Sequence, residues 1–296
     1  MGVSWTLREL VEQADRAAVA NLWQAALAPT WPLLPRGLDL FRRGFVAVEP
    51  GDRFVGAVAV DPAGSVPALM VAPGWRRQGV ATVLLAAAER RLRDLGRAEV
   101  RAGSGGGEYI WPGVPEDLPA AAPLLASRGW QLEHRTIDLT RDLVDYRPPS
   151  GVYDRARRAA VTITTASAAD QDDVVAFEAA TFPSWLTAFQ RWTSDALVAR
   201  DAAGRIVGTL LYAGPDADLT LRPMLGPACG AIGCVGVAPD AQGLGIGTAM
   251  VAQASELLHE RGTRLCHIGW VVREAFYTRV GYRPWRGYLM YRKALA

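Results

Sequence analysis

A glycine-dense segment in the second half of the chain has the composition of a phosphate-binding loop. Glycines let backbone N–H groups approach a phosphate, and the positive end of a helix dipole favours an anion at the helix start. The segment follows an apolar run that ends at Val237 and precedes a long helical pattern. The pattern therefore predicts that a diphosphate binds to Gln242, Gly243, Leu244, Gly245, Ile246, Gly247 and Thr248.

The same arrangement occurs in the first half of the chain. Val71-Ala72-Pro73 lies 166 residues before Val237-Ala238-Pro239, and Gly79 and Gly245 share that spacing, as do Gly96 and Gly262. One spacing over three features indicates an internal duplication. The corresponding first-half loop consists of Arg76, Arg77, Gln78, Gly79, Val80 and Ala81.

Other interpretations of the two glycine segments fit less well. A Walker loop requires Gly-Lys-Ser/Thr, and neither segment contains lysine. A Rossmann site requires its glycines directly after a first strand and an acidic residue about 20 residues later, which the pattern does not match. A strand–turn–helix whose glycines serve only packing stays open for one copy, but two copies at one spacing make it less favoured.

Helices and strands in a repeated order must position these loops. Apolar spacing predicts a fold of the α/β (α+β) class, in which each half combines helices with a mixed sheet. Ser167 and Asp170 form a capping box at the start of one helix. A Pro-Pro linker over 147–151 divides the chain into domains 1–147 and 152–296. The first half is predicted to contain a helix over 7–28, strands over 44–48, 54–60 and 67–71, and a helix over 82–95; the second, a helix over 167–181, a hairpin over 196–212 and a strand over 265–270.

Composition excludes several other functions. The 296 residues carry a formal net charge of +2, with basic residues dispersed among acids, which argues against nucleic-acid binding. No apolar run approaches the length of a membrane span, and the N-terminus lacks a signal-peptide core, so we expect a cytoplasmic protein without membrane contact. The three cysteines have no metal-ligand spacing and are expected to be reduced, with no metal bound. Lys293 is the only lysine, which suggests a bacterium with a GC-rich genome.

The two motifs together resemble a known family. Val-x-Pro followed by Gln/Arg-x-x-Gly-x-Gly/Ala resembles the coenzyme A pyrophosphate motif of the GNAT N-acetyltransferase superfamily, and it occurs in both halves. The chain thus resembles a tandem GNAT protein, which implies two folds, each a mixed, mostly antiparallel sheet flanked by helices. The resemblance implies acetyl-CoA as cofactor, bound in the second half by Val235, Val237 and residues 242–248 and in the first half by Val71 and residues 76–81.

The resemblance also implies direct attack of a primary amine on the thioester. A backbone N–H near Val237 would polarise the thioester carbonyl, and Tyr277, four residues before Gly281-Tyr282, would protonate the departing thiolate. The first half has Leu125 at the position of Tyr277, which cannot donate a proton. That half is therefore expected to bind acetyl-CoA without catalysis, to use another donor such as Tyr109, or only to build the substrate cleft.

The acceptor amine is less closely defined by the sequence. His267 and Trp270 lie on one predicted strand and are candidate substrate contacts, although core packing is the commoner role of such residues. His267, Glu178 and Glu274 remain open as general base. The resemblance extends to enzymes that acetylate glucosamine or glucosaminides. The alternatives are a mycothiol synthase, acetylation of another small-molecule amine or antibiotic, and a non-catalytic acetyl-CoA-binding scaffold. Two domains in one chain would form an internal pseudo-dimer, so a monomer or a homodimer is expected.

Overall fold

The computed structural model describes residues 4–103, 110–191 and 195–295, which form two compact units. Unit 1 consists of Met1–Thr136 and Arg286–Ala296, and unit 2 of Ile137–Trp285. The chain passes between the units twice, inside β8 (Gln131–Asp142) and inside β14 (Arg283–Ala294). This division differs from the expected boundary at 147–152, because the strand that closes each repeat continues into the other unit.

Unit 1 contains an antiparallel sheet with the strand order β1-β2-β3-β5. The helix expected from residue 7 is wrong at its start, because Thr6–Glu9 pairs with β2, Thr6 lying opposite Val48. A second group of strands contains β4, β6, β7 and the end of β14. The elements of unit 1 are β1 (Thr6–Glu9), α1 (Glu12–Ala26), β2 (Gly44–Val48), β3 (Phe54–Ala59), β4 (Ser65–Val66), β5 (Leu69–Val71), α2 (Val80–Asp94), β6 (Glu99–Ala102), β7 (Val114–Pro115) and α3 (Ala121–Ser127).

Unit 2 is built on a mixed sheet with the order β8-β13-β12-β11-β10-β9. Only the pair β12 and β13 is parallel among these described strands; the other neighbours are antiparallel. The elements of unit 2 are α4 (Asp154–Arg158), β9 (Thr162–Thr165), α5 (Gln171–Thr181), α6 (Leu186–Arg191), β10 (Asp195–Arg200), β11 (Ile206–Ala213), α7 (Arg222–Leu225), β12 (Cys229–Val237), α8 (Ile246–Glu260), β13 (Leu265–Val271) and α9 (Glu274–Thr278).

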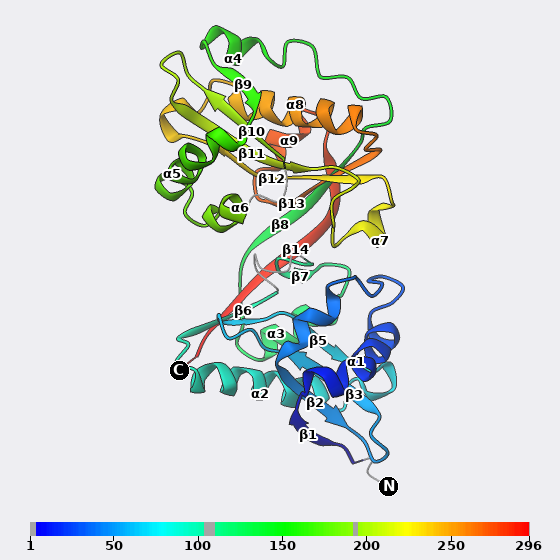
Figure 1. Ribbon diagram of the computed structural model, residues 1–296. Helices are drawn as coiled ribbons and strands as arrows, with labels where there is room; N and C mark the ends of the chain where they lie inside the picture. The colour runs from blue at the N-terminus through cyan, green and yellow to red at the C-terminus, as the bar shows by residue number, and fades with distance from the viewer. Residues whose placement is uncertain (1–3, 104–109, 192–194, 296) are drawn as a thin grey trace. The chain divides into compact units, whose positions relative to one another are not determined.

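Helices cover both faces of the unit 2 sheet (Figure 1). Successive residues of β10 divide between the two faces: Leu197 and Ala199 belong to the core under α8, whereas Val198 packs with Val174 of α5. A strand buried on both faces is apolar at every position, as β10 is at Ala196 to Ala199. We call these two sides the α8 face and the α5 face.

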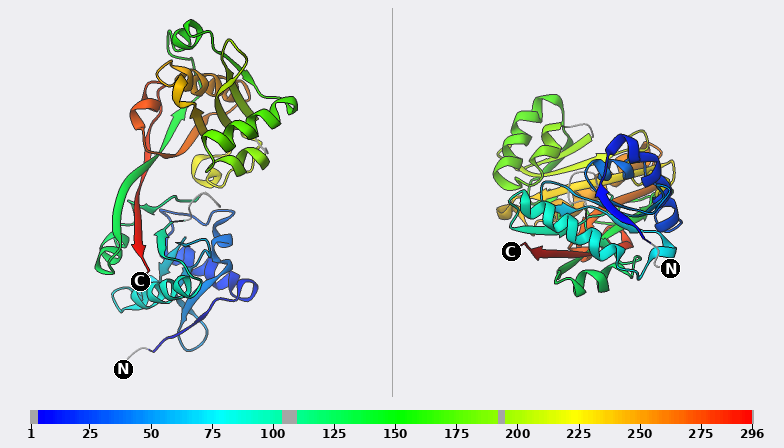
Figure 2. Two further views of the ribbon diagram at one scale, coloured as in Figure 1. Left: turned by 90° about the vertical axis from the view of Figure 1, so that its left-hand side faces the viewer. Right: turned by 90° about the horizontal axis from the view of Figure 1, so that it is seen from below.

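The last strand of the chain completes unit 1. Arg292, Lys293 and Ala294 of β14 pair antiparallel with Arg101, Val100 and Glu99 of β6. The red end of β14 can be followed to this position in Figure 2. The sheet of unit 2, in turn, receives the end of β8, where Leu139 lies opposite Ile268. Each unit therefore contains the final strand of the other repeat.

Candidate functional site

The glycine loop of unit 2 connects the end of β12 to the start of α8. Gly243 and Gly245 have φ of +82° and +78°, a left-handed conformation that favours glycine. The side-chain amide of Gln242 donates to the carbonyl of Val237 at 3.3 Å and holds the loop against the end of the strand. In the described part of the chain no side chain caps α8, so the N–H groups at its start are available to an anion.

The loop of unit 1 repeats this backbone conformation. Arg77 and Gly79 have φ of +63° and +81°, which matches Gly243 and Gly245. Arg76 donates from Nε to the carbonyl of Val71 at 3.3 Å, as Gln242 does to Val237. The internal duplication inferred from spacing is therefore also present in the dihedral angles and hydrogen bonds of the two loops.

The other predicted loop residues have different local roles. Ile246 and Val80 are buried under their helices, so only their backbones can contact a ligand. Leu244 is exposed, and Thr248 and Ala81 are half-buried in the first helical turns. A Cβ at Gly247 would lie 3.0 Å from Cζ of Phe276, so this glycine lets α9 pack against the start of α8.

Two arginines that sequence reasoning missed lie beside the unit 2 loop. Arg155 donates a hydrogen bond to the carbonyl of Gly243 from the short helix α4. Arg155, Arg158, Ala159 and Leu244 line a pocket of about 270 Å³. The helix over 154–158 has only 5 residues, which is too short to show an apolar period in the sequence. Its closely spaced arginines, however, could have indicated an anion site.

The parallel strands β12 and β13 diverge next to this loop. Their pairing runs from Cys229 and Leu265 to Ile232 and Ile268 and does not continue beyond them in the described residues. Each strand has an irregularity where pairing stops, with Cys234 at φ +50° and Trp270 at φ +56°. A Cβ at Gly233 would meet no atom within 4 Å, so there is open space at this strand position.

Tyr277 and Cys234 lie close together where the strands diverge. Burial raises the pKa of Tyr277 to about 12, and the Cys234 sulfur, when charged, raises it further. Burial, with a smaller effect of Glu178, raises the pKa of Cys234 to about 12. Both groups are therefore protonated at neutral pH. The phenol can donate a proton, whereas the thiol is a poor nucleophile.

Glu178 has a buried carboxylate on the α5 face. Its Oε1 accepts a hydrogen bond from Oγ1 of Thr209, and its side chain is fully buried. Its Oε2 has no hydrogen-bond partner in the part of the chain that the structure describes. Burial raises the pKa of Glu178 to about 7, although the hydrogen bond from Thr209 opposes this shift.

His267 and Trp270 are brought together by Asp138, which sequence reasoning missed. Asp138 is fully buried, and its carboxylate accepts from the backbone N–H of Trp270 at 2.9 Å and lies 3.0 Å from Nε2 of His267. The indole of Trp285 packs edge-on to His267, with ring centroids 5.7 Å apart. Asp138 alternates with apolar Ile137 and Leu139, a pattern that predicts a solvent-facing residue rather than a buried carboxylate.

Tryptophans fill the equivalent part of unit 1. Pro67 is the counterpart of Gly233 at the 166-residue spacing, and Trp111 donates from Nε1 to its carbonyl at 2.6 Å. Trp111 also stacks on Trp23 at 5.5 Å and contacts the edge of Trp31 at 5.1 Å. The counterpart of Tyr277, Leu125, is buried in the core. The alternative donor Tyr109 lies outside the described residues.

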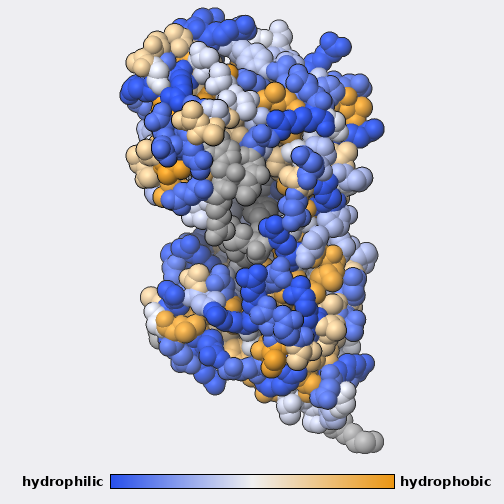
Figure 3. Space-filling view, viewed as in Figure 1, coloured by the Kyte–Doolittle hydropathy of each residue, from blue (hydrophilic) through white to orange (hydrophobic). Residues whose placement is uncertain are grey.

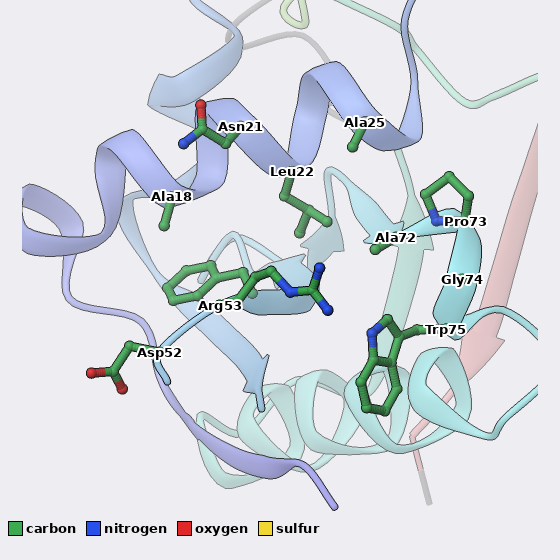
Figure 4. A pocket seen from close by; sticks show the side chains of 11 residues that line it. Ala18, Asn21, Leu22, Ala25, Asp52, Arg53, Ala72, Pro73, Gly74 and Trp75 are labelled. Carbon is green, nitrogen blue, oxygen red and sulfur yellow. The ribbon is translucent and has the colours of Figure 1, made fainter. Parts of the chain in front are cut away.

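Unit 1 also has a separate pocket of about 460 Å³ (Figure 4). The side chains of Leu22 and Ala25 on α1 face it from one side and Trp75 from the other, with Arg53 between them. Gly74 and Trp75 immediately precede the unit 1 loop, but the loop residues 76–81 do not line the pocket. The pocket is therefore distinct from the predicted phosphate site.

Three further observations concern metal sites, membrane spans and surface hydrophobicity. Among residues 4–103, 110–191 and 195–295, no cluster of His, Cys, Asp and Glu has the arrangement of a metal site. In that same part of the chain, every helix is too short or too polar to cross a bilayer. On the coloured part of the face shown in Figure 3, hydrophilic side chains predominate and hydrophobic ones are scattered.

Comparison with known sequences finds a family whose model matches both halves of the chain. The family described as "Acetyltransferase (GNAT) family" matches residues 10–103 and 164–282. A mycothiol acetyltransferase of Clavibacter sepedonicus is 29% identical over 246 residues, which are 78% of this chain and 68% of the relative. A mycothiol acetyltransferase of Mycobacterium sp. (strain MCS) is 29% identical over 221 residues, 72% of each chain.

Solved structures share the fold of this chain over nearly its whole length. The glucosamine N-acetyltransferase region of a fungal multi-domain GH3 β-N-acetylglucosaminidase matches with a TM-score of 0.89 and 28% identity. The match covers 99% of this chain and 38% of that chain, so this chain spans well under half of the fungal protein. A tandem GNAT protein from the clavulanic acid biosynthesis pathway matches over 99% of both chains with a TM-score of 0.64 and 18% identity, a likeness of fold alone.

Proposed function

Because the chain belongs to the acetyltransferase (GNAT) family, we propose that unit 2 transfers the acetyl group of acetyl-CoA to the primary amine of an amino sugar. One observation carries the assignment to unit 2. Only this unit, among the described residues, combines the glycine loop with open space between diverging strands and a proton-donating tyrosine next to it. The glycine loop would bind the diphosphate, with Arg155 and Arg158 adding positive charge beside it.

The residues at the strand divergence fit a thioester ligand. Acetyl-CoA supplies the activated acetyl group. The part of β12 from Gly233 to Val237 is not paired with β13, so its backbone N–H groups can orient an acyl carbonyl there. Tyr277 holds its proton at neutral pH and would donate it to the departing sulfur. Since the thiol of Cys234 is also protonated, direct transfer to the amine is favoured over an acylated cysteine.

The amino-sugar assignment is supported by side chains and relatives. Trp270 is 38% exposed next to the His267–Asp138 pair, and an aromatic ring beside polar groups suits a sugar ring. The fungal region that this chain resembles is described as a glucosamine N-acetyltransferase. The relatives described as mycothiol acetyltransferases favour a second candidate, an amino-sugar conjugate as acceptor.

We propose that unit 1 does not catalyse. Leu125 replaces the tyrosine, and Trp111, which stacks on Trp23, bonds to the carbonyl of Pro67, the counterpart of Gly233. The unit 1 loop retains the conformation for binding a diphosphate, so acetyl-CoA binding by Val71 and residues 76–81 remains part of the proposal. A cytoplasmic location and a monomer are further proposals, the former supported by the three free cysteines.

A thiol-release assay tests the proposal. Purified protein is mixed with acetyl-CoA and glucosamine, chitobiose, a cysteinyl glucosaminide, a polyamine or a peptide N-terminus. N-Acetylglucosamine, which has no free amine, is the matched negative control. Thiol release with amino sugars and acetylated product by mass spectrometry are expected. Release only with the cysteinyl conjugate supports the second candidate, and binding of acetyl-CoA without release for any amine contradicts catalysis.

A further inference from the structure

We propose that Glu178 is the general base of this reaction, with Oε2 accepting the proton that the acceptor ammonium must lose before its nitrogen can attack. The proposal rests on the proposed transfer in unit 2. It assigns a role to the one buried carboxylate of the described residues whose oxygen lacks a partner.

An unpaired carboxylate oxygen is costly inside a protein. Most buried polar atoms have hydrogen-bond partners, and those that lack one require an explanation. Glu178 is fully buried between α5 and the sheet, and Thr209 satisfies only one of its two oxygens. Asp138, another fully buried acid, accepts from Trp270 and pairs with His267. An acceptor ammonium, or one water between the two, would supply the partner that Oε2 lacks.

The position of Glu178 matches the course of the reaction. Cys234 packs against the cluster on the α5 face, which contains Val174 of α5, and its pKa responds to Glu178. Ile232 belongs to the core on the α8 face, so Gly233 faces the α5 side, where the open space lies. Tyr277 packs with the core on the α8 face. A base on one face can take a proton from the attacking nitrogen, and an acid on the other face can give a proton to the departing sulfur.

The proton transfers balance with these two residues. The amine enters as an ammonium, whose first N–H bond breaks with the proton passing to Oε2 of Glu178. The neutral nitrogen then forms the N–C bond as the C–S bond breaks, and Tyr277 gives its proton to sulfur. The nitrogen's second proton restores Tyr277, and Glu178 releases its proton to solvent after the product leaves. One proton is released per acetyl group transferred.

The acid strength of Glu178 suits this role. A general base works best when its pKa is close to the working pH. Burial brings the pKa of Glu178 to about 7, so a substantial fraction is ionised at neutral pH. Cys234 is the titratable neighbour that interacts with it in the described part of the chain, and its thiol is neutral at that pH. Of the other candidates, Nε2 of His267 lies 3.0 Å from the carboxylate of Asp138 and Glu274 is exposed to solvent, whereas Oε2 of Glu178 is buried without a partner in the described part of the chain.

The pH dependence of kcat/KM separates this role from a structural one. In the wild type we expect an ascending limb near pH 7 whose position stays constant when acceptors of different amine pKa are used. Glu178→Gln should remove this limb and lower kcat/KM about 100-fold at pH 7, since general bases contribute on this scale. Activity should recover at high pH, where the free amine needs no base, and acetyl-CoA affinity by calorimetry should stay unchanged.

Thr209→Val gives an independent test that keeps the carboxylate. The hydrogen bond from Thr209 stabilises the ionised form of Glu178, so its loss should move the limb to higher pH. Asp172→Asn, at an exposed acid on the same helix as Glu178, is the matched control and should retain the wild-type profile. This variant pair remains informative even where Glu178→Gln fails to fold.

The outcomes separate the two proposals. An unchanged limb in Thr209→Val, or wild-type turnover in a folded Glu178→Gln, removes Glu178 from the mechanism while acetyl transfer stands. A wild-type protein that acetylates no amine contradicts the proposed function itself.

Discussion

Glu178 and Tyr277 lie on opposite faces of the unit 2 sheet, and both interact with the same residue, Cys234. The sheet is open at this level, because β12 and β13 stop pairing after Ile232 and Ile268. A ligand that passes between the strands would therefore have a carboxylate on one side and a phenol on the other. The proposed direction of transfer follows from this relationship, with the acceptor on the α5 face.

Replacing Tyr277 by Phe should lower kcat about 100-fold, because a positioned acid typically contributes this much to turnover. Acetyl-CoA affinity should change little, since the ring and its packing against Phe276 are retained. Thiol-release kinetics and calorimetry measure the two effects. Tyr282→Phe is the control on the same turn, because its buried hydroxyl bonds Ser255 at 2.8 Å and serves stability. Equal turnover losses in both variants argue for a packing role of Tyr277.

Replacing Cys234 by Ala should leave turnover within a few-fold of the wild type. Burial raises the pKa of its thiol to about 12, so a reactive thiolate is scarce at neutral pH. Mass spectrometry of wild-type protein after incubation with acetyl-CoA alone should show no acetylated enzyme. An acetyl adduct on Cys234, together with loss of turnover in Cys234→Ala, would instead establish transfer through the cysteine.

Gly245→Ala should weaken acetyl-CoA binding, whereas Gly262→Ala should not. Both glycines have positive φ, +78° and +82°, so each substitution should destabilise the fold by about 1 kcal/mol. Only Gly245 lies in the loop, where a Cβ would also lie 2.8 Å from Cβ of Arg155. Calorimetry gives affinity and stoichiometry for both variants, and Gly79→Ala reports in the same way on unit 1. Loss of one of two sites in Gly79→Ala would show that both units bind.

Arg155→Ala should raise the Kd for coenzyme A about fivefold at low salt, because a guanidinium adds a charge-assisted contact to a phosphate site. The effect should shrink at high salt, where the charge is screened. Arg157→Ala is the matched control, since Arg157 lies on the same helix but pairs with Asp154 at 3.0 Å. If the two substitutions raise the Kd for coenzyme A equally, Arg155 contributes through the net positive charge of the helix and not through a specific contact.

Glu178→Gln should stabilise unit 2 at alkaline pH. Because burial raises the pKa of Glu178 to about 7, the folded state binds this proton more tightly than the unfolded state. Wild-type stability should therefore fall as pH rises from about 4.5 to 7, by up to about 3 kcal/mol. Urea unfolding at pH 5.5 and 8.5 should show a stability gain from the substitution that is larger at pH 8.5. A pH-independent difference would contradict the shifted pKa.

The parts of the site that depend on local backbone could be predicted from the sequence. Gly79 and Gly245, which the 166-residue spacing relates, have similar φ angles of +81° and +78°. Ser167 and Asp170 form the expected capping box. These features follow from residues a few positions apart, whose conformation is set by short-range sterics and hydrogen bonds. The role of Tyr277 as proton donor stays a prediction, and its hydroxyl is buried and interacts with Cys234.

The features set by tertiary contacts could not be predicted. An apolar alternation indicates a strand but not its partner, so nothing in residues 131–142 shows that the strand enters unit 2. Asp138 and Glu178 have the sequence patterns of exposed acids, yet both side chains are buried because distant strands cover them. The Trp111 contact with Pro67 depends in the same way on residues 44 positions apart.

Each unit contains the final strand of the other repeat, and this limits the order in which the two units can fold during synthesis. Val100 of unit 1 pairs with Lys293, so the unit whose first strand is Thr6–Glu9 is completed only by the final strand of the second repeat. Domains usually fold as they are synthesised, from the N-terminus onward. Here one edge of β6 stays unpaired until β14 of the second repeat has been synthesised. A messenger truncated after the first repeat would thus encode an incomplete sheet rather than half an enzyme.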